Sequence, residues 1–176
     1  MRLFPIHAFA VLALLFSGCA GYHVGPIQPK FMADIHTLAV PSFKNDTLEP
    51  RIEVALATAV IKQFQQDGTY KIVDEKNADA IVQGTLELIR RRSARSVRGN
   101  VLATREYILE LKCRITVTNR TTGEIIDQRG ISGQTSFFVT GSSSPAADVN
   151  TDERQAIPLA AEDMAIQLVS QLSEGW

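Results

Sequence analysis

The sequence contains few of the residues on which most catalytic and metal sites depend. Its 176 residues include three histidines and two cysteines. The histidines are His7, His23 and His36, so all of them precede the main body of the chain. A Ser-His-Asp or Cys-His system would need one of them to fold back onto a nucleophile. Metal-ligand spacing and a phosphate-binding glycine motif are absent too, so we expect no enzyme activity, no metal and no cofactor.

The sequence also has no large excess of positive or negative charge. The 18 basic and 19 acidic residues give a formal net charge of −1. This balance excludes the global positive field of a non-specific nucleic-acid-binding protein, so any attraction for polyanions must be local. With 45% hydrophobic and 21% charged residues, the composition is that of a globular domain. We therefore expect one folded domain that acts by binding a partner.

A long apolar run lies at the amino terminus. It extends over residues 8–16 and follows the α-amine and Arg2. This length is about half of the roughly 20 residues that a membrane-spanning helix requires. The pattern therefore predicts a cleaved secretory signal and not a transmembrane anchor.

The residues after this run resemble a lipobox, the bacterial site at which a cysteine is acylated. Ser17 and Gly18 are small and precede Cys19, although Phe16 stands where the pattern usually has Leu, Val or Ile. We expect residues 1–18 to be a lipoprotein signal peptide and Cys19 to carry the lipid, with palmitate or a similar chain on its new amino group. The alternative is an ordinary secretory signal with an incidental cysteine.

The lipid chains would hold the protein at a membrane, since each buried methylene contributes about 0.8 kcal/mol. Ala20 follows the cysteine, where an Asp would resemble the inner-membrane retention signal. We therefore expect attachment to the periplasmic face of the outer membrane. Residues 19–33 contain glycines and prolines without periodicity, which predicts a lipid-anchored tether before a single domain over residues 34–176.

Four segments carry the alternation of β-strands. They cover residues 36–43, 80–88, 107–117 and 124–138, and residues 70–73 are compatible with a further short strand. The third is the clearest, and its alternation makes Cys113 a core residue rather than a nucleophile. Turn formers at residues 119–123 join the last two strands. In the last strand, Gly130 and Gly133 are candidate bulges.

Two segments carry helical periodicity. The first has an apolar stripe followed by Gly68 as a candidate left-handed cap. Residues 45–47 offer N-cap candidates, and Pro50 suits a first turn. The stripe consists of Ile52, Leu56, Ala59, Val60 and Phe64.

The second helix is predicted to begin at a capping box formed by Asn150 and Glu153, after a flexible serine-rich loop over residues 140–150. Pro158 must kink this helix or mark its start. The order strand, helix, three strands, helix predicts an α+β two-layer sandwich, in which two helices cover one face of a mixed four-stranded sheet. The uncovered face is free for partners.

A cluster of arginines without an acidic residue spans the end of one long strand and the loop to the next. Because arginine forks bind phosphate bidentately, several guanidinium groups could converge there on a single anion. The alternative is a solvated strand edge whose charges discourage aggregation. The cluster consists of Arg90, Arg91, Arg92, Arg95 and Arg98.

Several motifs resemble the lipopolysaccharide-assembly lipoprotein (LptE) family. The segment Leu38–Pro50, followed by Glu53, is the most specific part of the resemblance. Gly21–Val24 after the lipid cysteine and Ala78–Ala80 leading into Gly84 fit the same pattern. The element order agrees from Cys19 onward.

The resemblance implies an outer-membrane lipoprotein that sits inside a large lipopolysaccharide-translocon β-barrel protein (LptD-like), helps that barrel to assemble, and binds lipopolysaccharide. It also implies that basic residues near the tip of the sheet bind lipid A phosphate, which here are Arg90, Arg91, Arg92, Arg95 and Arg98. The other interpretation is an oligomeric accessory lipoprotein of another secretion system, such as the curli-secretion type, because a similar short strand before a helix opens those domains.

Overall fold

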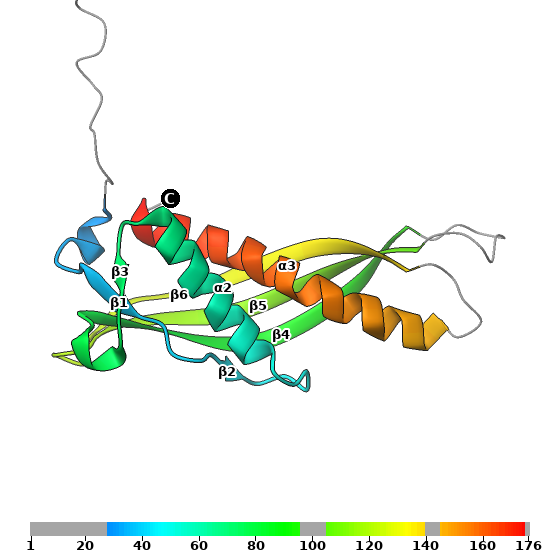
Figure 1. The fold of residues 1–176 in the computed structure, drawn as a ribbon, viewed down its shortest axis with the longest axis horizontal. Coiled ribbons are helices and arrows are strands. Elements are labelled where there is room, and N and C mark those ends of the chain that lie inside the picture. Colours follow the sequence, from blue (N-terminus) through cyan, green and yellow to red (C-terminus); the bar gives the residue numbers. More distant parts are fainter. Residues whose placement is uncertain (1–27, 96–104, 140–144, 175–176) are drawn as a thin grey trace, which may run out of the picture.

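A computed structural model describes residues 28–95, 105–139 and 145–174 of the chain (Figure 1). The expected signal peptide, Cys19 and Arg98 lie outside these residues. No helix within the described ranges is long and apolar enough to cross a membrane. The elements are η1 (Lys30–Met32), β1 (Thr37–Ala39), β2 (Lys44–Asn45), α2 (Ile52–Asp67), β3 (Lys71–Ile72), η2 (Glu75–Asn77), β4 (Ala80–Arg95), β5 (Arg105–Asn119), β6 (Ile125–Val139) and α3 (Pro145–Ser173).

The strands form one mixed sheet in the order β3-β1-β4-β5-β6, and β2 also pairs with β4. β1, β2 and β3 pair in parallel, whereas β4, β5 and β6 form an antiparallel meander. Both helices cover the same face of the sheet (Figure 1). The structure confirms the α+β sandwich, with six strands instead of four. The number is higher because β3 forms and because a second short strand, β2, follows the predicted strand over 36–43, of which only Thr37–Ala39 is a strand.

The long strands follow their sequence alternation. In β5, every second residue from Leu109 to Val117 is fully buried against the helices, including Cys113. The turn into β6 is organised by Asn119, whose side-chain oxygen accepts the N–H groups of Thr121 and Thr122. The predicted strand, its buried cysteine and the turn are all confirmed.

The glycines of β6 do not form the predicted bulges, because the β5–β6 register is regular at both of them. A side chain at Gly133 would place its Cβ 2.2 Å from the Ala160 carbonyl oxygen and 2.6 Å from the Met164 Cβ atom. Gly133 therefore lets α3 approach the sheet, while Gly130 has nothing within 4 Å of the corresponding position. Register shifts fall between Leu86 and Leu88, Ser93 and Arg95, and Val117 and Thr118.

The first predicted helix is α2, and its apolar stripe is confirmed except that Ala57 is buried more fully than Ala59. Gly68 ends it in a left-handed conformation, with φ 76°, and donates its N–H to the Phe64 carbonyl oxygen at 3.0 Å. The predicted N-cap is wrong. The helix begins after Arg51, so Pro50 lies outside its first turn.

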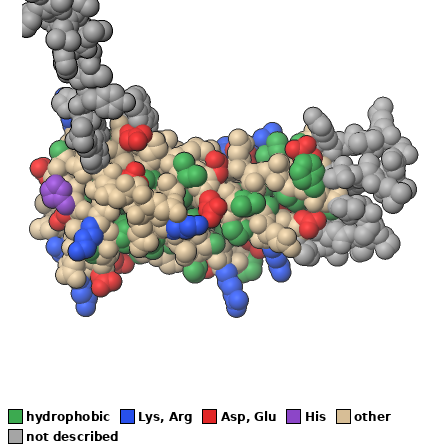
Figure 2. Space-filling view, turned by 45° about the horizontal axis from the view of Figure 1, so that its top comes forward, with side chains coloured by type: hydrophobic (Ala, Val, Ile, Leu, Met, Phe, Trp, Pro, Cys, Tyr) green, Lys and Arg blue, Asp and Glu red, His purple; other side chains and the backbone are tan. Residues whose placement is uncertain are grey.

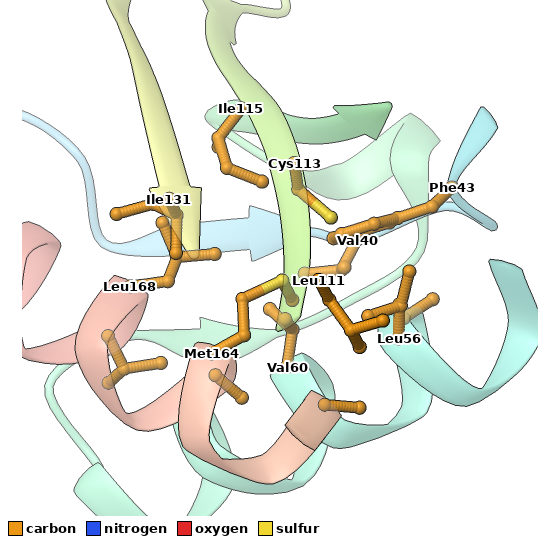
Figure 3. Close-up of a cluster of buried hydrophobic side chains, with 14 of the residues drawn as sticks. Val40, Phe43, Leu56, Val60, Leu111, Cys113, Ile115, Ile131, Met164 and Leu168 are labelled. Atoms are coloured by element: carbon orange, nitrogen blue, oxygen red, sulfur yellow. The ribbon is translucent and has the colours of Figure 1, made fainter. Parts of the chain in front are cut away.

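The second predicted helix is α3, which begins at Pro145 and not at the capping box. Glu153 is ion-paired with Arg91 of β4, and Pro158 lies inside the helix. The side chains of α2 and α3 meet over the middle of the sheet (Figure 3). Leu56 and Val60 from α2 and Met164 and Leu168 from α3 surround Leu111 of β5, and all five are fully buried.

The segment before β1 is part of the packed domain, although it precedes the expected boundary at residue 34. Met32 in η1 is fully buried. The Phe31 ring lies under the Arg129 guanidinium, with 5.5 Å between the guanidinium carbon and the ring centroid. η1 lies at the end of the sheet opposite the free ends of β4 and β5 (Figure 1).

Candidate functional site

The face of the meander that the helices leave uncovered is mostly polar, although it also carries the exposed Phe138, and we call it the open face. From β5 it carries Glu110, Lys112 and Arg114, which alternate with the core residues. Glu110 and Lys112 form an ion pair at 3.4 Å, and Arg114 pairs with Glu87. The exposed residues Gln128, Ser132 and Gln134 of β6 extend this face. These three charged residues that β5 contributes to the open face are therefore all paired.

The face of the molecule that Figure 2 shows has no region of a single charge. Acidic and basic side chains are interspersed in Figure 2, and hydrophobic side chains form separate small patches between them. This mixture agrees with the formal net charge of −1. Any site for an anion is therefore local.

Strand geometry separates the arginines of the cluster instead of gathering them. Arg90 and Arg92 lie opposite Glu110 and Ile108 of β5, which places both on the open face, where they are exposed. Arg91 points to the helix face and pairs with Glu153 of α3. Successive residues of a strand point to opposite faces, so the three cannot converge on one anion. The side chain of Arg95 and all of Arg98 fall outside the described structure.

The outer part of β4, residues 88–95, is a free edge of the sheet, and we call it the distal edge. β4 pairs with β1 and β2 only as far as Leu86. Beyond that residue, β5 is its only partner strand within the described part of the chain. The arginines at 90–92 thus lie both on a free edge and beside the open face, which suits either interpretation of the cluster.

A rigid loop lies where the distal edge begins. Asn45 fixes this loop, because its side-chain oxygen accepts the Thr47 N–H at 2.9 Å and its amide donates to the Glu49 carbonyl oxygen at 2.7 Å and to Glu53 at 3.1 Å. Leu48, at the tip, is entirely exposed. The loop lines an open hollow of about 400 Å³ together with Glu87, Leu88 and Ile89 of β4.

Leu48 is a surface feature that sequence reasoning missed. Residues 45–47 look like a helix N-cap, and nothing in the local pattern indicates that the chain makes a separate loop there. The sequence feature that could have indicated this loop is Asn45, three residues before Leu48. Asparagine side chains stabilise turns by forming hydrogen bonds with the backbone two residues further on.

The titratable groups with displaced pKa values are structural. Hydrogen bonds from the backbone N–H groups of His36 and Thr37 hold the pKa of the Asp79 carboxyl below its usual value. Burial raises the pKa of Tyr70 to about 12, with a smaller contribution from Asp67, and burial likewise raises the pKa of Cys113 to about 12. Among the residues described, no group of three or more His, Cys, Asp or Glu could hold a metal ion.

Several solved structures are similar to this chain at low sequence identity. A putative neuraminyllactose-binding hemagglutinin homolog from Helicobacter pylori is 12% identical with a TM-score of 0.52, covering 88% of this chain and 90% of that one. A hypothetical protein from Chlamydia trachomatis is 7% identical with a TM-score of 0.50, covering 79% and 96%. A minor lipoprotein from Acinetobacter baumannii is 15% identical with a TM-score of 0.49, covering 79% and 91%. These likenesses concern the fold alone.

A sequence family provides the functional assignment. No curated protein sequence matches the chain. Residues 35–172 match the family described as Lipopolysaccharide-assembly (LptE). The match begins just before β1 and ends within α3, so it includes every strand of the sheet. The chain therefore belongs to the lipopolysaccharide-assembly (LptE) family of envelope lipoproteins.

Proposed function

We propose that this chain is an outer-membrane lipoprotein that plugs a lipopolysaccharide-translocating β-barrel and assists its assembly. The observation that carries the proposal is the family match over residues 35–172. The lipobox-like residues Ser17, Gly18 and Cys19 support a lipid anchor on the periplasmic face.

The dimensions and polarity of the meander support a position inside a barrel. The lumen of a large barrel is polar, which suits the charged and amide side chains of the open face. β4 has 16 residues, and at about 3.3 Å per residue it extends roughly 50 Å. This length exceeds the roughly 30 Å hydrocarbon core of a bilayer. The meander can therefore extend through the depth of a membrane-embedded barrel.

The chain also binds lipopolysaccharide in this proposal, through phosphate groups of lipid A. Arg90 and Arg92 are exposed, and neither has an ion pair among the described residues. Arg91 contributes less because Glu153 already neutralises it. Arg95 and Arg98 follow in the same segment and remain part of the proposed site.

Affinity capture tests the proposal directly. Tagged, acylated protein is purified from detergent-solubilised outer membranes, and the co-purifying proteins are identified by mass spectrometry. We expect one large lipopolysaccharide-transport barrel in stoichiometric amount. A homo-oligomer of the chain without a barrel would favour the secretion-accessory interpretation instead.

A further inference from the structure

The distal edge of β4 has backbone groups that no strand uses. The N–H of Gln134 in β6 donates away from the sheet, to Asp163 at 2.9 Å, so the preceding residue of β6 and its partner Leu111 in β5 bond to each other. Because the backbone groups of successive residues point to opposite neighbours, the N–H and C=O groups of Lys112 point toward β4, where its partner is Leu88. The intervening residues of β4 present their N–H and C=O groups outward. These residues are Ile89, Arg91 and Ser93.

The side chains of these residues leave the edge uncovered. The Ile89 side chain packs on the core, and the Arg91 side chain is drawn to the helix face by Glu153. Ser93 is small and exposed. Between the two register shifts of β4, residues 88–93 form a regular stretch without proline or glycine. An extended chain can approach such an edge without displacing any side chain of the sheet.

We propose that residues 88–93 of β4 accept an extended acidic segment of the barrel partner by β-strand addition. Main-chain hydrogen bonds to Ile89, Arg91 and Ser93 supply affinity, as in other strand-addition complexes. The identity of the partner as the barrel rests on the proposed function.

The charge pattern of the open face determines which side chains the added barrel segment should carry. Leu88, Arg90 and Arg92 alternate along that face, and no acidic residue lies within 88–93. Glu110, which faces Arg90 from β5, is occupied by Lys112. A complementary segment has one apolar residue and two carboxylates at alternate positions, because directly opposed side chains of paired strands are in contact. Its apolar residue also covers the exposed Leu48 beside Leu88.

The added strand and lipopolysaccharide phosphate would share Arg90 and Arg92. Binding of the one therefore displaces the other, and occupation of the edge by the barrel segment regulates the access of lipopolysaccharide to the arginines. Competition between the two ligands is a consequence of the proposal.

The first test uses the full acylated chain in non-ionic detergent and a ten-residue peptide with one leucine and two aspartates at alternate positions among threonines and valines. A peptide with lysines in place of the aspartates is the control. We expect the aspartate peptide to bind and the lysine peptide not to bind. The bound aspartate peptide should slow hydrogen exchange at the amides of Ile89, Arg91 and Ser93, and lipopolysaccharide should displace it. Equal binding of the two peptides, no binding of either, or unchanged exchange would overturn the proposal.

Two sets of variants separate edge pairing from charge. Ser93→Pro removes an outward N–H that takes no part in the β4–β5 ladder, and Ser93→Ala is its matched control. We expect Ser93→Pro to weaken peptide binding about tenfold and to reduce the amount of barrel that co-purifies, while Ser93→Ala changes neither. Arg90→Glu with Arg92→Glu should reverse the preference toward the lysine peptide, which keeps the test decisive if Ser93→Pro folds poorly.

The outcomes distinguish this proposal from the function on which it rests. If the barrel co-purifies equally with Ser93→Pro and Ser93→Ala, the edge takes up no barrel segment, and the plug function and the phosphate site at the arginines both stand. If no barrel co-purifies with the unmodified chain, the proposed function itself fails.

Discussion

Asp79 joins the beginning of β1 to the beginning of β4 through a compact set of hydrogen bonds. Its carboxylate accepts the N–H groups of His36 at 3.0 Å and Thr37 at 2.8 Å. The Thr37 hydroxyl accepts the N–H of Asp79 in return, at 2.9 Å. These contacts fix the start of a short parallel pairing between β1 and β4, so we expect the residue to matter for stability.

Asp79→Asn should lower the free energy of unfolding by about 1 kcal/mol at neutral pH, because a neutral amide oxygen accepts these bonds more weakly. The pKa of Asp79 in the folded state lies below its ordinary value of 3.8. The contribution of Asp79 to the free energy of unfolding is therefore fully present above pH 3.8 and is lost as the pH falls through the lowered pKa. Urea unfolding of both proteins from pH 7 to pH 2 should show the difference shrinking at the acid end. A difference that stays constant with pH would contradict this account.

Arg90 and Arg92 should account for the salt-sensitive part of lipopolysaccharide binding. Replacing both with alanine is expected to weaken binding about tenfold or more at low salt, since each removes a charge-assisted hydrogen bond to phosphate. Arg91→Ala is the control, because Arg91 lies on the opposite face of the sheet, and this variant should bind lipopolysaccharide with little change in affinity. Binding is measured by titration at several salt concentrations, and an unchanged affinity of the double variant at low salt would remove the arginines from the proposed site.

At the scale of elements, α3 is held to the sheet by close contact at Gly133. Gly133→Ala should lower the free energy of unfolding by about 2–3 kcal/mol, because the new methyl group overlaps the α3 backbone at Ala160. Gly130→Ala in the same strand is the matched control and should change stability by less than about 0.5 kcal/mol, since that position is open. Chemical denaturation of the two variants measures both, and equal effects would disprove the contact.

The carboxyl-terminal end of α3 is held by Tyr70, which precedes β3 and donates its hydroxyl to the Leu172 carbonyl oxygen at 2.7 Å. Tyr70→Phe should cost about 1 kcal/mol at neutral pH because a buried acceptor loses its partner. The pKa of Tyr70 is raised from 10.0 to about 12, so its contribution is present below pH 10 and is lost as the pH rises toward 12. Unfolding measured across this range should show the two proteins converging, and a constant gap would contradict the role of the hydroxyl.

Sequence patterns predicted the elements whose signals are local and periodic. The alternation in β5 and the apolar stripe of α2 correctly identified the buried faces, including Cys113. Elements that depend on distant contacts could not be predicted in the same way. The two-residue strand β2 exists only because β4 lies beside it, whereas the possible strand over 70–73 is present as β3. The sequence suggested a bulge at Gly133. The glycine is instead required by the close approach of α3, which comes from a distant part of the sequence.

The candidate site was predictable in composition but not in geometry. The arginine cluster is visible in the sequence, yet its division between two faces depends on the β4–β5 register and on the register shift after Leu86. Glu153, which neutralises Arg91, is 62 residues away along the chain. The free edge of β4 likewise follows from where β2 stops, and no local pattern marks that position.

At the scale of the whole molecule, a packed sandwich carries a long meander whose outer part has an open face and a free edge. η1 lies at the opposite end of the sheet (Figure 1). In the proposed complex, the anchored end stays near the periplasmic surface while the arginines of β4 reach into the barrel.

The most direct test of the barrel complex is site-specific photocrosslinking in cells from Ser132, an exposed residue of the open face. The account predicts one dominant adduct, between the chain and a large lipopolysaccharide-transport barrel. Adducts only between copies of the chain, or none with a barrel, would contradict it.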